Sequence, residues 1–347
     1  MGTRGVRVSV IYFISKLNKW DDFRMEIMTK CTQDVIKKAA KGLIDGHLVA
    51  FPTETVYGLG ADATNEKAVR RIYSVKNRPT SHPLIVHISS ITQLNNWTIE
   101  IPDFALELAK EFWPGPMTLV LKHSPRAKDF ITGSQTTVGI RVPCHPIALA
   151  LLKEFELFGG LGVVAPSANI FGGVSPTSAE SVNQAIGDLL SNQDFLLDGG
   201  SSSIGVESTI IDCTQNSPVI LRPGAITKSM IQHCTGKIVQ APITKDLPKF
   251  SGSFASHYAP KAQVILDKAP LNGDGFIALF EIKTPNGAIR LASPKNSQEY
   301  ASCLYDALRE ADNKNLSRVI AVSPKGNEIE VAIRDRLGKA SAERNCP

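Results

Sequence analysis

The chain has 347 residues, of which 43% are hydrophobic and 20% charged, and 38 Lys and Arg against 33 Asp and Glu give a formal charge of +5. This apolar fraction excludes a disordered chain, and 26 Gly with 21 Pro exclude a collagen-like or low-complexity chain. A dedicated nucleic-acid-binding protein is usually far more basic. The length suggests two domains, although a single large barrel would also fit, and in both cases the chain can bury a large core.

The six cysteines are widely spaced and form no CxxC pair, which argues against a zinc site and a disulfide scaffold. We interpret them as reduced thiols and expect a cytoplasmic protein. The early apolar stretch at residues 8–14 is much shorter than the roughly 20 residues of a membrane span, so no membrane association is expected. Residues 1–27 are expected to form a poorly ordered extension.

Helical and strand patterns alternate irregularly between residues 28 and 241. Thr32 is a predicted N-cap for a helix whose apolar residues recur at helical spacing up to Leu43, and Gly46 follows as a stop. Further helices are predicted at residues 66–75, 104–112, 147–155 and 178–190, and strands at 48–51, 84–88, 118–122, 138–142, 162–165 and 209–213. The pattern indicates a mixed α/β domain rather than a regular βαβ array.

Turn-forming residues are concentrated at residues 242–260, which we predict to be a linker. Beyond it, predicted strands at 262–266, 275–280 and 318–322 alternate with helices at 302–310 and 328–337. Residues 261–347 are therefore expected to form a small second α/β domain.

Several well-known motifs are missing or incomplete. Residues 58–63 fit G-x-G-x-x-A after a strand, but the acid that a dinucleotide site requires about 20 residues later is absent, because no acid lies between Glu66 and Glu100. The sequence also contains no P-loop, no G-x-S-x-G elbow and no H-E-x-x-H motif. The remaining candidates are dispersed polar residues at strand and helix ends.

Lys76 and Arg78 stand one residue apart at a helix end, where they fit either a polyphosphate clamp or a solvated helix terminus. Arg141 lies in an apolar strand and is expected to have an anionic partner, either a protein carboxylate or a ligand carboxylate. The small polar residues at 166–169 and 172–177 would let a backbone approach phosphate closely, although they also suit an ordinary capped loop.

Ten short motifs follow one another in a fixed order. They are PTETVYGLG (52–60), KNRP (76–79), WPGPMTLVL (113–121), GIRVP (139–143), PSAN (166–169), SPT (175–177), DGG (198–200), GVESTI (205–210), LRPG (221–224) and HYAP (257–260). Together they resemble the long form of the threonylcarbamoyl-AMP synthase family. The resemblance implies a YrdC-like mixed α/β catalytic domain with a concave active-site face, a linker and a small Rossmann-like α/β C-terminal domain.

The resemblance implies an L-threonylcarbamoyladenylate synthase, a nucleotidyltransferase. It would make threonylcarbamoyl-AMP and pyrophosphate from L-threonine, bicarbonate and ATP carrying Mg²⁺. The product would feed a threonylcarbamoyl-transferase machinery that modifies adenosine 37 of tRNA. Two alternatives stay open, a double-stranded RNA- or tRNA-binding YrdC-like protein without synthase activity and a carbamoyl-adenylate-forming relative. The charge of +5 leaves room for weak tRNA contact.

The resemblance also assigns site residues. Lys76 and Arg78 would be catalytic as the triphosphate clamp. The further nucleotide positions are His82, Thr137, Asn169, Ser175, Thr177, Arg222 and, in the linker, Tyr258. The threonine and carbamate positions are Thr55, His87, Arg141, Ser167 and Ser208, with Arg141 expected at the threonine carboxylate. His82 departs from an asparagine frequent in the family, and no protein metal ligand is expected.

Overall fold

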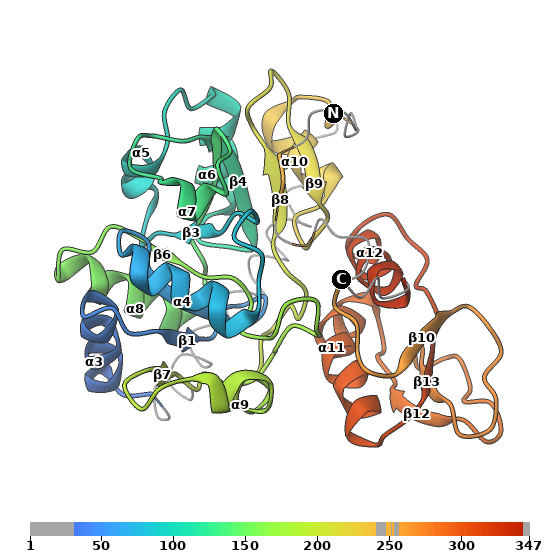
Figure 1. Ribbon diagram of the computed structural model, residues 1–347. Helices are drawn as coiled ribbons and strands as arrows, with labels where there is room; N and C mark the ends of the chain where they lie inside the picture. Colours follow the sequence, from blue (N-terminus) through green and yellow to red (C-terminus); the bar gives the residue numbers. More distant parts are fainter. Residues whose placement is uncertain (1–30, 241–247, 251, 253–256, 343–347) are drawn as a thin grey trace.

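The computed structural model describes residues 31–240, 248–250, 252 and 257–342, which form two α/β domains (Figure 1). The extension predicted for residues 1–27 and part of the linker predicted for residues 242–260 lie outside the described residues. Both domains combine strands and helices, so the predicted mixed α/β fold class is confirmed.

The larger domain is built, within the described residues, on a nine-stranded sheet of order β7-β1-β2-β6-β3-β5-β4-β8-β9. Its elements are α3 (Gln33–Ile44), β1 (Val49–Phe51), β2 (Gly58–Asp62), α4 (Glu66–Lys76), β3 (Ile85–His87), α5 (Leu94–Trp97), α6 (Asp103–Phe112), β4 (Met117–Lys122), α7 (Asp129–Thr132), β5 (Thr137–Arg141), α8 (Pro146–Leu157), β6 (Val163–Val164), α9 (Ala179–Ile186), β7 (Phe195–Leu196), β8 (Thr209–Asp212), β9 (Val219–Arg222) and α10 (Lys228–Thr235). Short 3₁₀ turns occupy Ile91–Gln93 and Gly187–Leu189.

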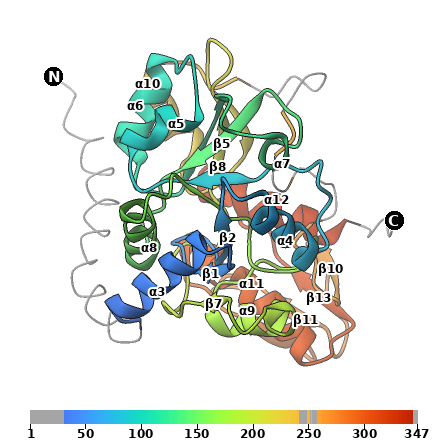
Figure 2. The same ribbon diagram turned by 60° about the vertical axis from the view of Figure 1, so that its left-hand side comes forward.

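Helices α3 and α8 pack side by side (Figure 2) and share one hydrophobic cluster with the sheet, in which Ile36 and Leu151 are completely buried. The predicted start of α3 is confirmed, because the Thr32 hydroxyl accepts a hydrogen bond from the backbone N–H of Val35. Gly46 follows the helix with φ of +88°, a left-handed conformation that favours glycine.

Strand β2 was not among the expected elements, since glycines weaken a strand signal. Close packing of the neighbouring strands explains why glycines occupy β2. A side chain at Gly60 would place its Cβ 2.8 Å from the Phe51 ring and 3.0 Å from the Val49 carbonyl oxygen on the neighbouring strand β1. The sequence reasoning also missed β9 and α10, which follow one another after residue 218.

The smaller domain has a four-stranded sheet of order β10-β13-β11-β12, in which every neighbouring pair is parallel. Its elements are β10 (Gln263–Leu266), β11 (Gly275–Ile277), β12 (Ile289–Ala292), α11 (Ser297–Asn313), β13 (Arg318–Ala321) and α12 (Ile329–Ser341). Helix α11 begins five residues earlier than residue 302, because the Asn296 side chain caps it by accepting from the Glu299 N–H.

The two domains share a hydrophobic cluster. Val56 and Val206 of the larger domain and the linker residue Tyr258 join the residues buried beneath α11 and α12. Direct hydrogen bonds cross the same boundary, including Arg309 Nη2 to the carbonyl of Val174 at 3.0 Å. The second domain is therefore packed against the first, and Figure 1 shows α11 on the side of the second domain that faces the larger domain.

Candidate active site

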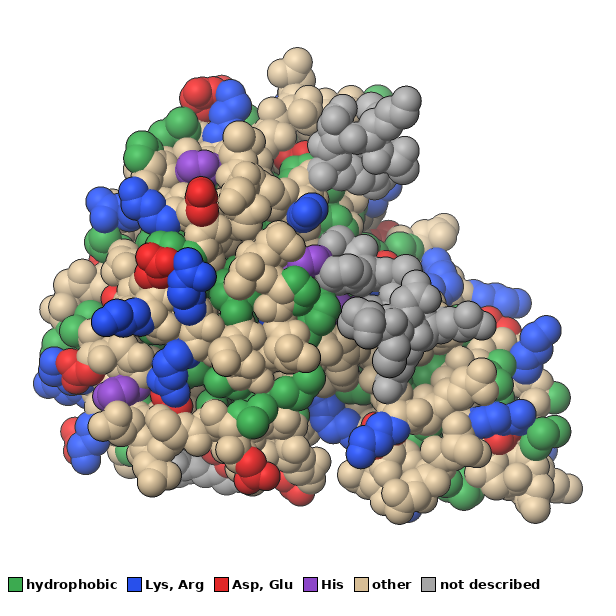
Figure 3. Space-filling model, viewed as in Figure 1, with side chains coloured by type: hydrophobic (Ala, Val, Ile, Leu, Met, Phe, Trp, Pro, Cys, Tyr) green, Lys and Arg blue, Asp and Glu red, His purple; other side chains and the backbone are tan. Residues whose placement is uncertain are grey.

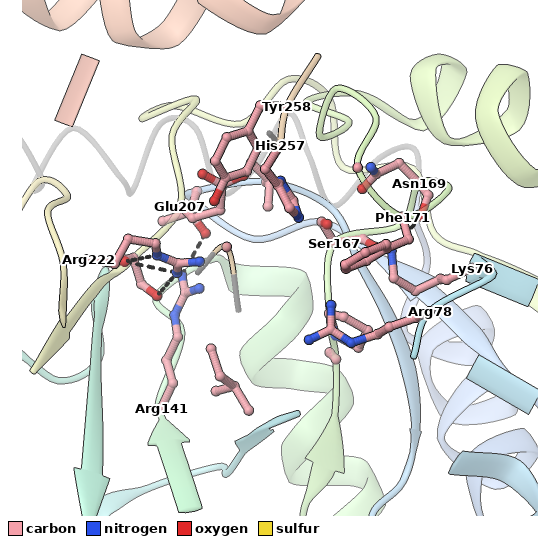
Figure 4. A pocket seen from close by; sticks show the side chains of 18 of the residues that line it. Lys76, Arg78, Arg141, Ser167, Asn169, Phe171, Glu207, Arg222, His257 and Tyr258 are labelled. Atoms are coloured by element: carbon pink, nitrogen blue, oxygen red, sulfur yellow. Dashed lines mark hydrogen bonds between the residues drawn. The ribbon is translucent and has the colours of Figure 1, made fainter. Parts of the chain in front are cut away.

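One pocket collects most of the polar residues singled out in the sequence (Figure 4). Its walls come from the ends of strands β3, β5, β8 and β9, the end of α4, the loop after β6 and the linker. Among its lining residues are Thr55, Lys76, Arg78, His87, Arg141, Ser167, Asn169, Phe171, Glu207, Ser208, Arg222, Gly252, His257 and Tyr258. Residues up to 203 positions apart in the chain thus meet in one cavity.

Lys76 and Arg78 flank the C-cap of helix α4. Asn77, between them, has φ of 50° and ψ of 45°, a left-handed conformation that asparagine tolerates better than most residues. This bend ends the helix and turns both cations into the pocket, where Figure 4 shows them on the same side. The asparagine between the two cations is thus explained by backbone geometry.

Neutral oxygens hold Lys76. Its ammonium donates to the carbonyl of Ser167 at 2.6 Å and to the carbonyl of Asn169. Burial, with the nearby Arg78 charge, lowers the pKa of Lys76 well below its ordinary value. The described residues offer Lys76 no carboxylate within ion-pair distance.

Arg78 donates to the carbonyl of Pro83 at 3.0 Å, and its guanidinium lies 5.5 Å from the centre of the Phe171 ring. Burial lowers its pKa to about 10, so it stays charged at neutral pH. The Lys76–Arg78 side of the pocket therefore carries positive charge in a poorly hydrated setting, which favours an anionic ligand.

Arg141 ends strand β5, and its Nη2 lies 2.5 Å from Oε1 of Glu54 and 2.9 Å from the Thr55 hydroxyl. Of the two anionic partners expected for Arg141, a protein carboxylate or a ligand carboxylate, the structure shows the first. Its Nε is buried without a hydrogen-bond partner among the described residues. One edge of the guanidinium is left for a second acceptor.

His87 stands opposite Arg141 in the register of the parallel strands β3 and β5. Parallel neighbours bring their carboxyl ends to one edge of the sheet, which is where ligands bind in open α/β sheets. Burial, with the charge of Arg141, lowers the pKa of His87 to about 3, so the ring is neutral.

Ser208 and Arg222 bring β8 and β9 into the site. The Arg222 guanidinium donates to the Ser208 carbonyl from Nε at 3.1 Å and from Nη2 at 3.0 Å. The Ser208 hydroxyl also contacts Thr118 Oγ1 at 2.8 Å, which fixes its position in the wall.

The linker closes over these residues. Tyr258 has φ of 62° and is almost completely buried, and its hydroxyl has no hydrogen-bond partner among the described residues. His257 packs against Tyr258 with ring centres 4.1 Å apart, and burial lowers the pKa of His257 to about 3. A buried phenol hydroxyl without a partner indicates a place where a polar ligand group fits.

Four predicted nucleotide residues lie outside this wall. His82 packs behind it, edge-on to Phe171 at 5.7 Å, and Thr137 lines a neighbouring apolar pocket with Ile85 and Phe250. At the domain boundary, Ser175 donates to Glu207 at 2.6 Å and Thr177 donates to Asp306. Their contact with a nucleotide stays a prediction.

Four lining or supporting residues were not singled out in the sequence: Glu54, Phe171, Glu207 and His257. Glu54, Glu207 and His257 belong to quoted motifs, and Phe171 lies between two of them, so the available signal was position relative to a motif rather than residue type. Neither of the two acids was given a role in the sequence analysis. Both are paired with buried arginines, Glu54 with Arg141 and Glu207 with Arg336.

In the part of the chain that the structure describes, no group of three or more His, Cys, Asp or Glu could hold a metal, and no helix could span a membrane. On the face in Figure 3, basic and acidic side chains are interspersed rather than gathered into one basic patch. This face offers little support for shape-based RNA binding, which needs a concentrated positive surface.

Two family models together match most of the chain. The model described as "Telomere recombination" (Sua5–YciO–YrdC) matches residues 41–224, and the model described as "Threonylcarbamoyl-AMP synthase, C-terminal domain" matches residues 226–342.

Curated relatives named threonylcarbamoyl-AMP synthase match over nearly their whole length. The Pyrococcus abyssi protein is 41% identical over 328 residues, covering 89% of this chain and 94% of the relative. The Bacillus subtilis protein is 38% identical, covering 95% and 99%. The Schizosaccharomyces pombe protein is 31% identical, covering 92% and 91%.

Among solved structures, P. abyssi Sua5 complexed with L-threonine superposes with a TM-score of 0.79 at 38% identity, covering 89% of this chain and 94% of that one. The similarity extends over both domains, in sequence and in structure. The chain therefore belongs to the threonylcarbamoyl-AMP synthase family.

Proposed function

We propose that this protein is an L-threonylcarbamoyladenylate synthase, a nucleotidyltransferase that joins L-threonine, bicarbonate and the AMP part of ATP. The observation that carries the proposal is that Lys76, Arg78 and Arg141 line the same pocket. The clamp suits a triphosphate, and the guanidinium edge of Arg141 suits the carboxylate of an amino acid. A family member has been crystallised with L-threonine.

Threonine would bind at Arg141, Thr55, His87, Ser167 and Ser208. Its carboxylate would occupy the buried Nε edge of Arg141, while Glu54 keeps the Nη2 edge. Because His87 is neutral, its ring adds no second positive charge beside the ligand. The combined charge of Glu54 and Arg141 is zero, which suits a zwitterion.

The reaction would proceed in two bond-forming steps. Bicarbonate takes up a proton and loses water to give carbon dioxide, and the threonine amine, as the free base, adds to that carbon. The nitrogen then loses a proton, which balances the one taken up, so the net products of this step are the N-carboxylate and water. A carboxylate oxygen then attacks the α-phosphorus of ATP, and the bond to the β,γ-pyrophosphate breaks. The products are threonylcarbamoyl-AMP and pyrophosphate, so no oxidant, reductant or covalent protein intermediate is required.

Charge neutralisation and alignment are the contributions of the protein. Lys76, Arg78 and Arg222 would offset the repulsion between the attacking carboxylate and the phosphates. Mg²⁺ would enter with ATP as part of the substrate, since the pocket is lined by cations and its carboxylate Glu207 is already paired. Tyr258 and His257 would exclude water from the unstable carbamate.

The finer assignments follow from this reaction. We place the protein in the cytoplasm, where ATP and threonine are available, and a threonylcarbamoyl-transferase machinery would transfer its product to adenosine 37 of tRNA. Weak contact with tRNA is compatible with this role but is not needed for synthesis.

The test is pyrophosphate release by the full chain with ATP, threonine and bicarbonate, omitting each in turn. Release must stop without threonine and without bicarbonate, and a release that ignores threonine would contradict the proposal. Arg78→Ala should reduce release by about a hundredfold, the usual cost of removing a transition-state charge contact. Arg70→Ala, an exposed position on the same helix, is the matched control.

A further inference from the structure

Glu207 is a buried carboxylate in the pocket wall, and the second domain supplies most of its partners. Tyr305 OH donates to its Oε2 at 2.9 Å, and Arg336 Nε lies 2.8 Å from the same oxygen. Ser175 of the larger domain completes the set at 2.6 Å from Oε1. We call Tyr305 and Arg336 the Glu207 clamp.

The Glu207 clamp also contacts the linker. The Arg336 guanidinium lies 5.3 Å from the centre of the Tyr258 ring, and Tyr305 stacks on the same ring at 5.7 Å with an interplanar angle of 29°. Arg336 has no solvent exposure, and its Nη1 is held by Asp335 at 2.6 Å. One pair of side chains from α11 and α12 thus fixes a pocket carboxylate and the linker residue together.

The negative charge of Glu207 affects how Arg222 can bind a ligand. Glu207 lies on the same side of the pocket as Arg222 (Figure 4), close enough that the arginine charge helps to hold the pKa of Glu207 at about 2. Burial opposes that shift, and Arg336 is the strongest of the groups that outweigh it. Without Arg336, an uncompensated carboxylate would compete with phosphate for Arg222.

We propose that Arg336 and Tyr305 are positioning residues for ATP, contributed by the second domain. Arg336 neutralises the charge of Glu207 and Tyr305 donates a hydrogen bond to it, which leaves the positive charge of Arg222 to the nucleotide. Both side chains also pack on the Tyr258 ring and hold that ring over the site. The inference deepens the proposed function and rests on it, because it concerns the same ATP site.

The test is a double-mutant cycle in the full chain, with the Kd of Mg·ATP measured by calorimetry without threonine or bicarbonate. Arg336→Met should weaken ATP binding about tenfold or more, because it leaves Glu207 charged and unpaired. Adding Glu207→Gln should restore the Kd to within about threefold of wild type, since the competing charge is gone. A purely structural role for Arg336 predicts no such rescue.

Arg334→Met on the same helix is the matched control, because Arg334 donates hydrogen bonds to the carbonyls of Pro324 and Gly326 and its charge acts on Glu330 rather than on Glu207. If Arg336→Met does not fold, Tyr305→Phe carries the test, since it keeps the stacked ring and removes only the hydroxyl donor. It should weaken ATP binding about threefold, again with rescue by Glu207→Gln.

An unchanged Kd in Arg336→Met, or in Tyr305→Phe where that variant carries the test, would overturn the inference, as would a double variant no better than the single. These results would leave the proposed function standing, provided that wild type binds ATP and releases pyrophosphate with threonine. A wild-type chain that does neither would overturn both.

Discussion

Two buried cations on opposite sides of the pocket are held in different ways. Arg141 faces a full negative charge, the carboxylate of Glu54 at 2.5 Å, whereas Lys76 is held by the carbonyl oxygens of Ser167 and Asn169. An ion pair cancels charge, but carbonyl dipoles only solvate it. The Glu54–Arg141 pair is therefore close to neutral, which suits a zwitterion, whereas the positive charge at Lys76 and Arg78 is not cancelled by a carboxylate, which suits a triphosphate.

The largest effect is expected from Lys76→Met, which removes the uncancelled charge. We expect kcat/KM for ATP to fall by about a hundredfold to a thousandfold, as when a preorganised electrostatic contact is lost. Threonine-dependent pyrophosphate release measures it. Lys67→Met, at an exposed position on the same helix, should retain full activity. Equal activity in the two variants would contradict the claim that the charge of Lys76 serves the triphosphate.

Breaking the ion pair on the other side should act mainly on stability. Glu54→Gln leaves the buried Arg141 without its counter-charge and should lower the free energy of unfolding by about 3 kcal/mol. Urea denaturation measures the loss. Glu66→Gln, which breaks the exposed pair with Arg70, should cost no more than about 0.5 kcal/mol. Similar losses of unfolding free energy in both variants would show that the buried Glu54–Arg141 pair stabilises the fold no more than the exposed Glu66–Arg70 pair.

The smallest effect is a proton linkage at Lys76. Its pKa is depressed in the free protein by burial and by Arg78, and a bound triphosphate would raise it again. Between the depressed pKa and the ordinary value near 10.5, ATP binding should therefore take up a fraction of a proton. Calorimetry at pH 8 in two buffers of different ionisation enthalpy measures this uptake, and proton release assigned to Lys76 would contradict the assignment.

Sequence reasoning predicted the local features of the site better than its long-range ones. Lys76 and Arg78 lie within one motif, and the bounds predicted for their helix, α4, differ from the observed ones by one residue. The carboxylate partner of Arg141 is 87 positions away, and the sequence did not identify it. Ser175 and Thr177 donate to Glu207 and Asp306 at the domain boundary, partners that the sequence did not indicate, and their contact with a nucleotide stays a prediction. No pattern in one chain shows which carboxylate will fold against which hydroxyl.

The left-handed turn at Asn77 also affects how the Lys76–Arg78 pair forms during folding. Lys76 and Arg78 are brought together by the end of a single helix, so their proximity requires almost no loop closure and no docking of distant segments. Arg141 and Glu54, in contrast, meet only after the sheet has assembled. We therefore expect the Lys76–Arg78 pair to form early as a local unit, while the contacts of Lys76 with Ser167 and Asn169 and the threonine side form only with the complete fold.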